Sequence, residues 1–150
     1  MQIIIDGDSC PVIDLTIDIA RMNKIPVTIV KSINHVISSD YAKVISVDPI
    51  KESADFYIVN KVSEGDIVIS QDYGLAAMII PKNVKVITPR GLLIDDSNID
   101  TLLHHRYIAA KMRKQKRSFG SKSKKRTRTD NIKFVNSLKS VLKDISEYIS

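Results

Sequence analysis

The chain has 150 residues, 43% hydrophobic and 27% charged, with a net charge of +6. This composition fits one globular domain over residues 1–150, and no apolar run approaches the roughly 18 residues that would define a membrane span. The N-terminus lacks the basic start of a signal peptide and the single cysteine, Cys10, excludes an internal disulfide, so we expect a cytoplasmic protein.

Apolar runs without helical periodicity predict the strands. The runs at 3–5 and 67–69 are continuous and β-branched, which is typical of strands buried on both faces of a parallel sheet. Further strands are expected at 27–30 and 84–88, with a weaker one at 43–47.

Helical patterns alternate with these strands. We expect helices over 11–23, 49–61 and 73–80, the last one broken by the segment 81–83. A β-α-β alternation implies right-handed crossovers, so the fold class is α/β, a three-layer α/β/α sandwich with a mainly parallel sheet.

The last third is predicted to be two helices joined by a basic loop. Asp96 or Ser97 is the expected cap of the first helix, and Thr129 or Asp130 that of the second. The segment 118–129 is small, polar and basic, as expected for a flexible loop.

The positive charge is concentrated in this region. Residues 101–129 contain eleven Lys or Arg and no acid, and the other 12 basic residues are outnumbered by 17 acidic ones. Clustered cations attract phosphates, which predicts a polyanion partner; the alternative is a solvated loop that only aids solubility.

Asp6 and Asp8 are the strongest indication of a functional site in the sequence. They leave a central strand two residues apart, so extended geometry directs both side chains to one side. Carboxylates held this close repel unless they share a proton or bind a cation, and hard oxygen ligands suit Mg²⁺ or Mn²⁺. Alternatively, Asp6 bonds the loop backbone and Asp8 caps the following helix.

The other candidate residues can also be explained by a purely structural role. Asp72 follows the strand at 67–69 at the same predicted edge, yet it can simply cap a helix. Ser70 is either a buried hydroxyl or a donor to the acidic group. Arg90 either holds a phosphate or lies in a solvated turn, and Cys10 is expected to pack as a small hydrophobe.

Three segments in order carry a family resemblance. DGDSCPV at 6–12, SQDYGLA at 70–76 and PRG at 89–91 resemble the signatures of the bacterial YaiI/YqxD family, which is related to the PIN-like nucleases. The resemblance covers the whole chain. One departure is the loop after the basic helix, which keeps only Gly120 where the family commonly has a Gly-Gly pair.

The resemblance implies a PIN-like fold in which aspartates gather Mg²⁺ or Mn²⁺ to cut phosphodiesters. It nominates Asp6, Asp8, Asp72 and Asp55 as catalytic residues, and Asp130 as a late acid that joins Asp6, Asp8 and Asp72 at the metal. From spacing alone, Asp55 only pairs with a lysine one turn away, and Asp130 only caps a helix.

We therefore predict a metal-dependent nuclease acting on RNA or single-stranded nucleic acid. The expected nucleic-acid-binding residues are Arg90, Arg117, Lys122, Lys124, Lys125, Arg126 and Arg128. The alternatives are a non-catalytic nucleic-acid-binding protein with a degenerate site and a haloacid-dehalogenase-like phosphatase with Asp6 as nucleophile. No membrane partner is expected, and self-association into a homo-oligomer stays open.

Overall fold

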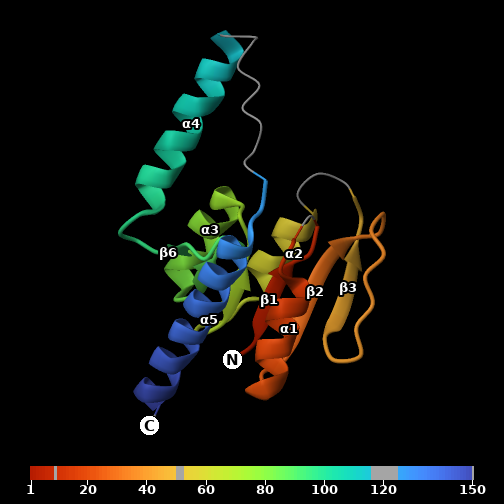
Figure 1. The fold of residues 1–150 in the computed structure, drawn as a ribbon. Helices are drawn as coiled ribbons and strands as arrows, with labels where there is room; N and C mark the ends of the chain where they lie inside the picture. Colours follow the sequence, from red (N-terminus) through yellow and green to blue (C-terminus); the bar gives the residue numbers. More distant parts are fainter. Residues whose placement is uncertain (9, 50–52, 116–124, 150) are drawn as a thin grey trace.

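The computed structural model describes residues 1–8, 10–49, 53–115 and 125–149, with side chains up to residue 147. Six strands form one sheet in the order β3-β2-β1-β4-β5-β6 (Figure 1). All neighbouring strands are parallel except β5 and β6. The strands are β1 (Ile3–Asp6), β2 (Val27–Ser32), β3 (Lys43–Val47), β4 (Ile67–Ile69), β5 (Lys85–Ile87) and β6 (Leu93–Ile94).

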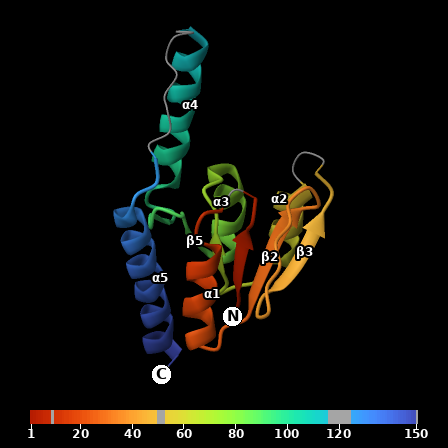
Figure 2. The same cartoon turned by 45° about the vertical axis from the view of Figure 1, so that its right-hand side comes forward.

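Helices cover both faces of this sheet (Figure 2). One face carries α1 and α5, and the other carries α2, α3 and the start of α4. The helices are α1 (Ile13–Met22), α2 (Ser53–Lys61), α3 (Tyr73–Ile79), α4 (Ile99–Gln115) and α5 (Arg128–Ile149). The predicted α/β/α sandwich with a mainly parallel sheet is confirmed.

The apolar run of β1 supplies both hydrophobic layers. Ile3 and Ile5 belong to one core with Phe134 of α5, while Ile4 belongs to the other with Leu75 of α3. All five side chains are at most 1% exposed. Successive residues of a strand point to opposite faces, so a strand covered on both sides must be apolar throughout.

Element boundaries differ from the predictions in three places. Helix α3 ends at Ile79, one residue before the predicted end, and Ile80–Lys82 forms a 3₁₀ turn that ends at Asn83 in the left-handed region. Strand β6 was not predicted, since two residues are too short to show a period. Helix α1 begins at Ile13, two residues after Pro11.

Of the caps predicted for the last two helices, only Asp130 takes part in capping. Before α4, Asp95 rather than Asp96 or Ser97 accepts, its carboxylate bonding the backbone N–H of Ser97. At α5 the capping residue is Thr127, whose N–H donates to the Asp130 carboxylate at 2.9 Å. This reciprocal arrangement is a capping box with Asp130 three residues into the helix.

Helix α4 leaves the body of the molecule. It packs against α3 at its start, where Ile99 is buried, but every side chain from His104 to Gln115 is exposed. In Figures 1 and 2 its far end rises beyond the sheet, at the end toward which the parallel strands point. No helix within the described ranges is long and apolar enough to cross a membrane.

Strand order places a crevice at the carboxyl end of β1. The chain runs from β1 outward to β2 and β3 on one side, then returns to β4 on the other side of β1. Where the connections after two neighbouring strands run in opposite directions, a crevice opens at the carboxyl ends of those strands. Ligands of open parallel sheets usually bind in this crevice. Asp6 ends β1, and Asp72 lies just beyond β4.

Candidate active site

An acidic cleft of about 430 Å³ lies at this edge. Five aspartates line it: Asp6, Asp8, Asp48, Asp55 and Asp72. The other lining residues are Ser32, Asn34, His35, Val47, Pro49, Ser53 and Ala54. The cleft therefore brings together the four aspartates predicted to be catalytic, although their chemical roles stay predictions.

Gly7 sets how the chain leaves β1. Its N–H donates to Val30 O at 2.7 Å, so the backbone continues against β2. A Cβ at this position would lie 2.8 Å from Ile29 Cγ2 and 3.1 Å from Val30 O, closer than packed side chains allow. A glycine between Asp6 and Asp8 thus lets both carboxylates stand over the edge of the sheet.

Ser70 connects the Asp6 carboxylate at the end of β1 with the backbone of Asp72 beyond β4. Its hydroxyl donates to Asp6 Oδ2 at 3.0 Å and accepts from the backbone N–H of Asp72 at 3.0 Å. The side chain is 3% exposed, so the predicted buried position and the predicted donor role are both observed.

Asp6 is the most perturbed carboxyl group of the cleft. Burial raises its pKa to about 6; the Ser70 hydroxyl opposes that rise, while the charges of Asp72 and Asp8 add to it. Asp72 acts on Asp6 more strongly than Asp8 does. A raised carboxyl pKa means that the ionised site holds unfavourable negative charge, which a cation relieves.

Asp72 serves the cleft and caps a helix. Its Oδ1 accepts from the Leu75 N–H at 3.1 Å as the N-cap of α3, while the residue lines the cleft. The capping and cleft interpretations of this residue are therefore compatible. No described residue bonds to its Oδ2, nor to Oδ1 of Asp6.

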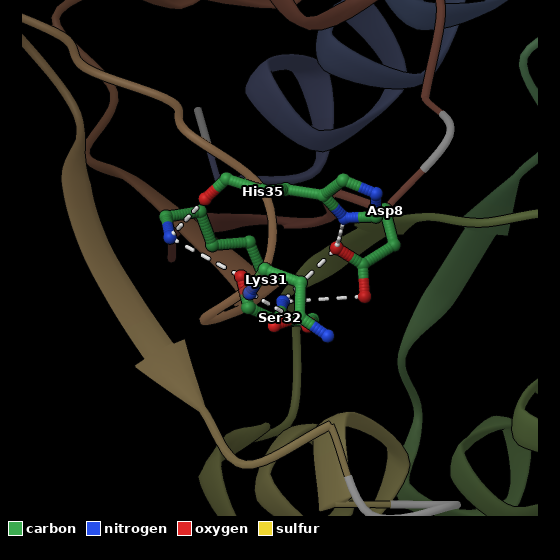
Figure 3. Close-up of polar contacts among 5 residues, drawn as sticks. Asp8, Lys31, Ser32 and His35 are labelled. Carbon is green, nitrogen blue, oxygen red and sulfur yellow. Dashed lines mark hydrogen bonds and ion pairs between the residues drawn. The ribbon is translucent and has the colours of Figure 1, made fainter.

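Asp8 is held by the end of β2 and the loop after it (Figure 3). The Ser32 N–H donates to both of its oxygens, at 2.9 and 3.2 Å, and His35 Nδ1 lies 2.5 Å from Oδ1. The Lys31 ammonium donates to the carbonyls of Ser32 and His35 at 3.2 and 2.5 Å. Both Asp8 oxygens are thus already engaged.

The described residues do not form a ready-made metal cage. Within ranges 1–8, 10–49, 53–115 and 125–149, no three His, Cys, Asp or Glu side chains are grouped as ligands of one ion. The carboxylates of Asp6 and Asp72 nevertheless offer two hard oxygen ligands. This set fits Mg²⁺ or Mn²⁺, which keep several waters and commonly use one or two protein carboxylates.

Asp130 lies outside the lining of the cleft. The Thr127 N–H lowers its pKa most, with further lowering by the cations Arg90 and Arg126. Its capping role accounts for its position, and the predicted metal role stays a prediction.

The predicted nucleic-acid-binding residues are only partly described. Arg117, Lys122 and Lys124 lie outside the described residues. Lys125, which precedes α5, and Arg128, its first residue, are exposed. Arg126 Nε donates to Asn131 Oδ1 at 2.9 Å, while its buried Nη2 meets no acceptor among the described residues.

The PRG segment forms a tight turn against α5. The Gly91 N–H donates to Thr88 O at 2.9 Å, and Gly91 has a φ of +89°. A Cβ there would lie 2.6 Å from the backbone of Lys133, so only glycine fits. Arg90 is exposed and near enough to Asp130 to lower its pKa. The turn is thus observed, and phosphate binding by Arg90 stays a prediction.

Cys10 packs against the core beneath the cleft. Burial raises the pKa of its thiol; the nearby Asp6 carboxylate adds to that rise, and the Arg126 guanidinium opposes it. This agrees with the packing role expected from the sequence.

His35 was not predicted as a site residue. It lies 27 positions from Asp8, in a loop without a strand or helix pattern. The only available signal was its place three residues after β2, a strand that ends at the same edge.

Comparisons with known proteins agree with the resemblance seen in the sequence. Residues 4–144 match a family described as "Uncharacterized BCR, YaiI/YqxD family". A "UPF0178 protein" of Clostridium kluyveri is 47% identical over 132 residues, covering 87% of this chain and 85% of the relative. One from Natranaerobius thermophilus is 42% identical over 142 residues, covering 95% and 96%. No solved structure matched the chain.

Proposed function

This chain belongs to the YaiI/YqxD family, and we propose that it is a metal-dependent nuclease cutting RNA or single-stranded nucleic acid. The observation that carries the proposal is the Asp6–Asp72 pair. Both carboxylates line one cleft, each has an oxygen that no described residue bonds, and burial raises the pKa of Asp6 to about 6.

In this proposal Asp6 and Asp72 hold Mg²⁺ or Mn²⁺. When bound, the ion supplies neutralisation of charge on the phosphate and a more acidic water. Asp8 is left out of the proposed metal-binding pair, because the Ser32 N–H and His35 already engage its oxygens. Asp130 is left out because its carboxylate caps α5.

Asp55 and Asp48 line the cleft with this pair. Asp55 lies in the first turn of α2, and Asp48 directly follows β3. We assign Asp55 to completing the shell of the ion or orienting water, as the family resemblance implies. Five aspartates among the described residues of the cleft attract cations and repel bare phosphates, so the substrate must be bound elsewhere.

Basic residues at the same end of the molecule supply that grip. Helix α4 carries four exposed cations beyond the sheet: Arg106, Lys111, Arg113 and Lys114. Arg90, Lys125, Arg126 and Arg128 lie near the start of α5. We propose that these groups bind phosphates of the substrate on either side of the bond that is cut.

The test is turnover of generic single-stranded RNA and DNA with Mg²⁺ or Mn²⁺. Asp6→Asn and Asp72→Asn should each lower the rate by at least about 100-fold, since each removes one of two metal ligands. The matched control is Asp144→Asn, an exposed aspartate near the far end of α5, which should leave the rate unchanged.

The same assay separates the alternatives. Binding without turnover would support a non-catalytic nucleic-acid-binding protein. Hydrolysis of para-nitrophenyl phosphate through a phosphorylated Asp6, without phosphodiester cleavage, would support the phosphatase. Either result would contradict the nuclease.

A further inference from the structure

Asp8 and His35 form a carboxylate–imidazole pair in the wall of the cleft (Figure 3). The 2.5 Å contact between Asp8 Oδ1 and His35 Nδ1 places the ring proton on Nδ1, because an ionised carboxylate can only accept. In the neutral ring, the other nitrogen, Nε2, then carries a lone pair. No described residue hydrogen-bonds to Nε2.

The loop that carries His35 is fixed from below by buried groups. Lys31 is 7% exposed, and its ammonium donates to the carbonyls of Ser32 and His35. The His35 N–H returns to Ser32 O at 3.1 Å, and the Asn34 N–H donates to Ser32 Oγ at 3.1 Å. His35 therefore has an exposed ring on a backbone held at several points.

A solvated surface ion pair does not account for this arrangement. Such pairs contribute about 0–1 kcal/mol and do not require a buried lysine to hold the loop beneath them. Here Asp8 also accepts from the Ser32 N–H with both oxygens, so the carboxylate is oriented before it meets the ring. A carboxylate that orients an imidazole, which then acts on a third group, is the arrangement of a general base.

We propose that His35 is the general base of the cleft and that Asp8 positions it, an inference that rests on the nuclease function proposed above. Among the described residues that line the cleft, His35 alone combines a proton-accepting nitrogen with a place beside the aspartates. Asp8 acts through His35 and is a positioning residue.

The step balances without any further reagent. The oxygen of a water molecule attacks phosphorus, and the proton of that water moves to His35 Nε2. The phosphorus–oxygen bond to the leaving nucleotide breaks, and its electron pair stays on the leaving oxygen, which takes a proton from solvent. The imidazolium then returns its proton to water, and the Asp8 carboxylate stabilises the charge in the meantime.

The experiment measures turnover of single-stranded RNA by wild type, His35→Ala and His35→Gln with saturating Mn²⁺. General base catalysis contributes about 10²- to 10⁴-fold, so both variants should lose that much in rate. Added imidazole should restore His35→Ala but not Asp6→Asn. The control is Asp144→Ala, an exposed residue of α5 outside both the cleft and α4, which should keep the wild-type rate.

Stabilisation by Mn²⁺, measured as a rise in Tm, shows whether each variant is folded and still binds the ion. A His35→Ala protein that keeps this rise, loses rate and regains it with imidazole supports the proposal. A variant with near-wild-type rate, or one whose lost rate imidazole does not restore, overturns the role of His35 while leaving the nuclease intact. Absence of turnover in wild type instead overturns the nuclease and this inference with it.

Discussion

The acidic cleft and the arm formed by α4 from His104 to Gln115 stand at the same end of the molecule but are built in opposite ways. The cleft lies over two strands whose apolar side chains are fully buried. Every side chain of the arm is exposed, including Tyr107 at 65% and Met112 at 54%. The side chains of the cleft are therefore positioned by tertiary packing, whereas the arm depends on its own helix and its charge.

The electrostatics of the two regions differ in the same way. Charges in the cleft are partly buried, and burial raises the pKa of Asp6, with smaller contributions from the charges of Asp72 and Asp8. Charges on the arm are separated by solvent and screened over about 8–10 Å at ordinary salt. Mutations in the cleft should therefore change stability and chemistry, and mutations on the arm should change salt-dependent binding.

The largest expected effect is on the core beneath the cleft. Phe134 is 0% exposed and packs against the sheet, so Phe134→Ala should lower the free energy of unfolding by about 3–5 kcal/mol. Tyr107→Ala removes a comparable ring from the arm and should change the free energy of unfolding by less than about 0.5 kcal/mol. Urea unfolding of both variants measures this. Equal losses would mean that the arm is packed against something in solution.

The next effect is the dependence of stability on pH through Asp6. Its pKa rises from an ordinary 3.8 to about 6 in the folded chain, so the ionised form is disfavoured by folding. The loss of folding stability caused by ionising Asp6 is absent below about pH 4 and grows as the pH rises through about 6. Above that pH it reaches up to about 3 kcal/mol. Asp6→Asn should therefore stabilise the metal-free protein at pH 8 and have little effect at pH 4.

Chemical denaturation at both pH values in the presence of a chelator checks this sign. Asp144→Asn is the control, because that exposed carboxylate lies on α5 outside the cleft. Equal stabilisation by Asp6→Asn at pH 4 and pH 8 would contradict the assigned origin of the shift.

A somewhat smaller effect is expected from the ion. Mn²⁺ at 100 times its Kd should stabilise wild type by about 2.7 kcal/mol, since it binds only the folded chain. Asp72→Asn should remove most of this gain, whereas Asp8→Asn should keep most of it, because Asp8 is assigned to His35. Thermal unfolding with and without Mn²⁺ measures both. A loss as large for Asp8→Asn would place Asp8 on the ion, as the sequence analysis predicted.

The sequence predicted the body of the fold better than the details of the site. Ile3–Ile5 and Ile67–Ile69 could be predicted as strands because a strand that is buried on both faces appears in the sequence as a continuous apolar run. Strand β6 escaped because two residues carry no period. Asp95 and Thr127 were missed as capping residues because several Ser, Thr, Asp and Asn residues lie close together at the start of both helices, and only geometry chooses among them.

The residues of the cleft could likewise be predicted only in part. Asp6, Asp8 and Asp72 were found because each follows a strand end, and parallel strands end at one edge. Asp55 entered through the family resemblance, since one aspartate in a helix is not distinguished by spacing. His35 was missed because its pairing with Asp8 depends on how the loop after β2 folds back. Lys31 bonds the His35 carbonyl in that loop, and no local sequence pattern reveals this contact.

The smallest effect on stability, and the sharpest on binding, is expected on the arm. Neutralising Arg106, Lys111, Arg113 and Lys114 to Gln should change the free energy of unfolding by less than about 0.5 kcal/mol, because all four are exposed and Gln is a comparable helix former. If each contacts a phosphate of a single strand, each lost contact lowers the slope of log affinity against log salt by about 0.7, so the slope should flatten by up to about 3. Fluorescence anisotropy with labelled RNA at several salt concentrations measures this slope, and binding should weaken about equally for all sequences.

The matched control replaces four exposed lysines on the body with Gln and should leave the slope unchanged; they are Lys24, Lys43, Lys61 and Lys85. An unaltered slope in the arm variant would show that the arm is solvated surface, and the grip on the substrate would then fall to the cations beside α5.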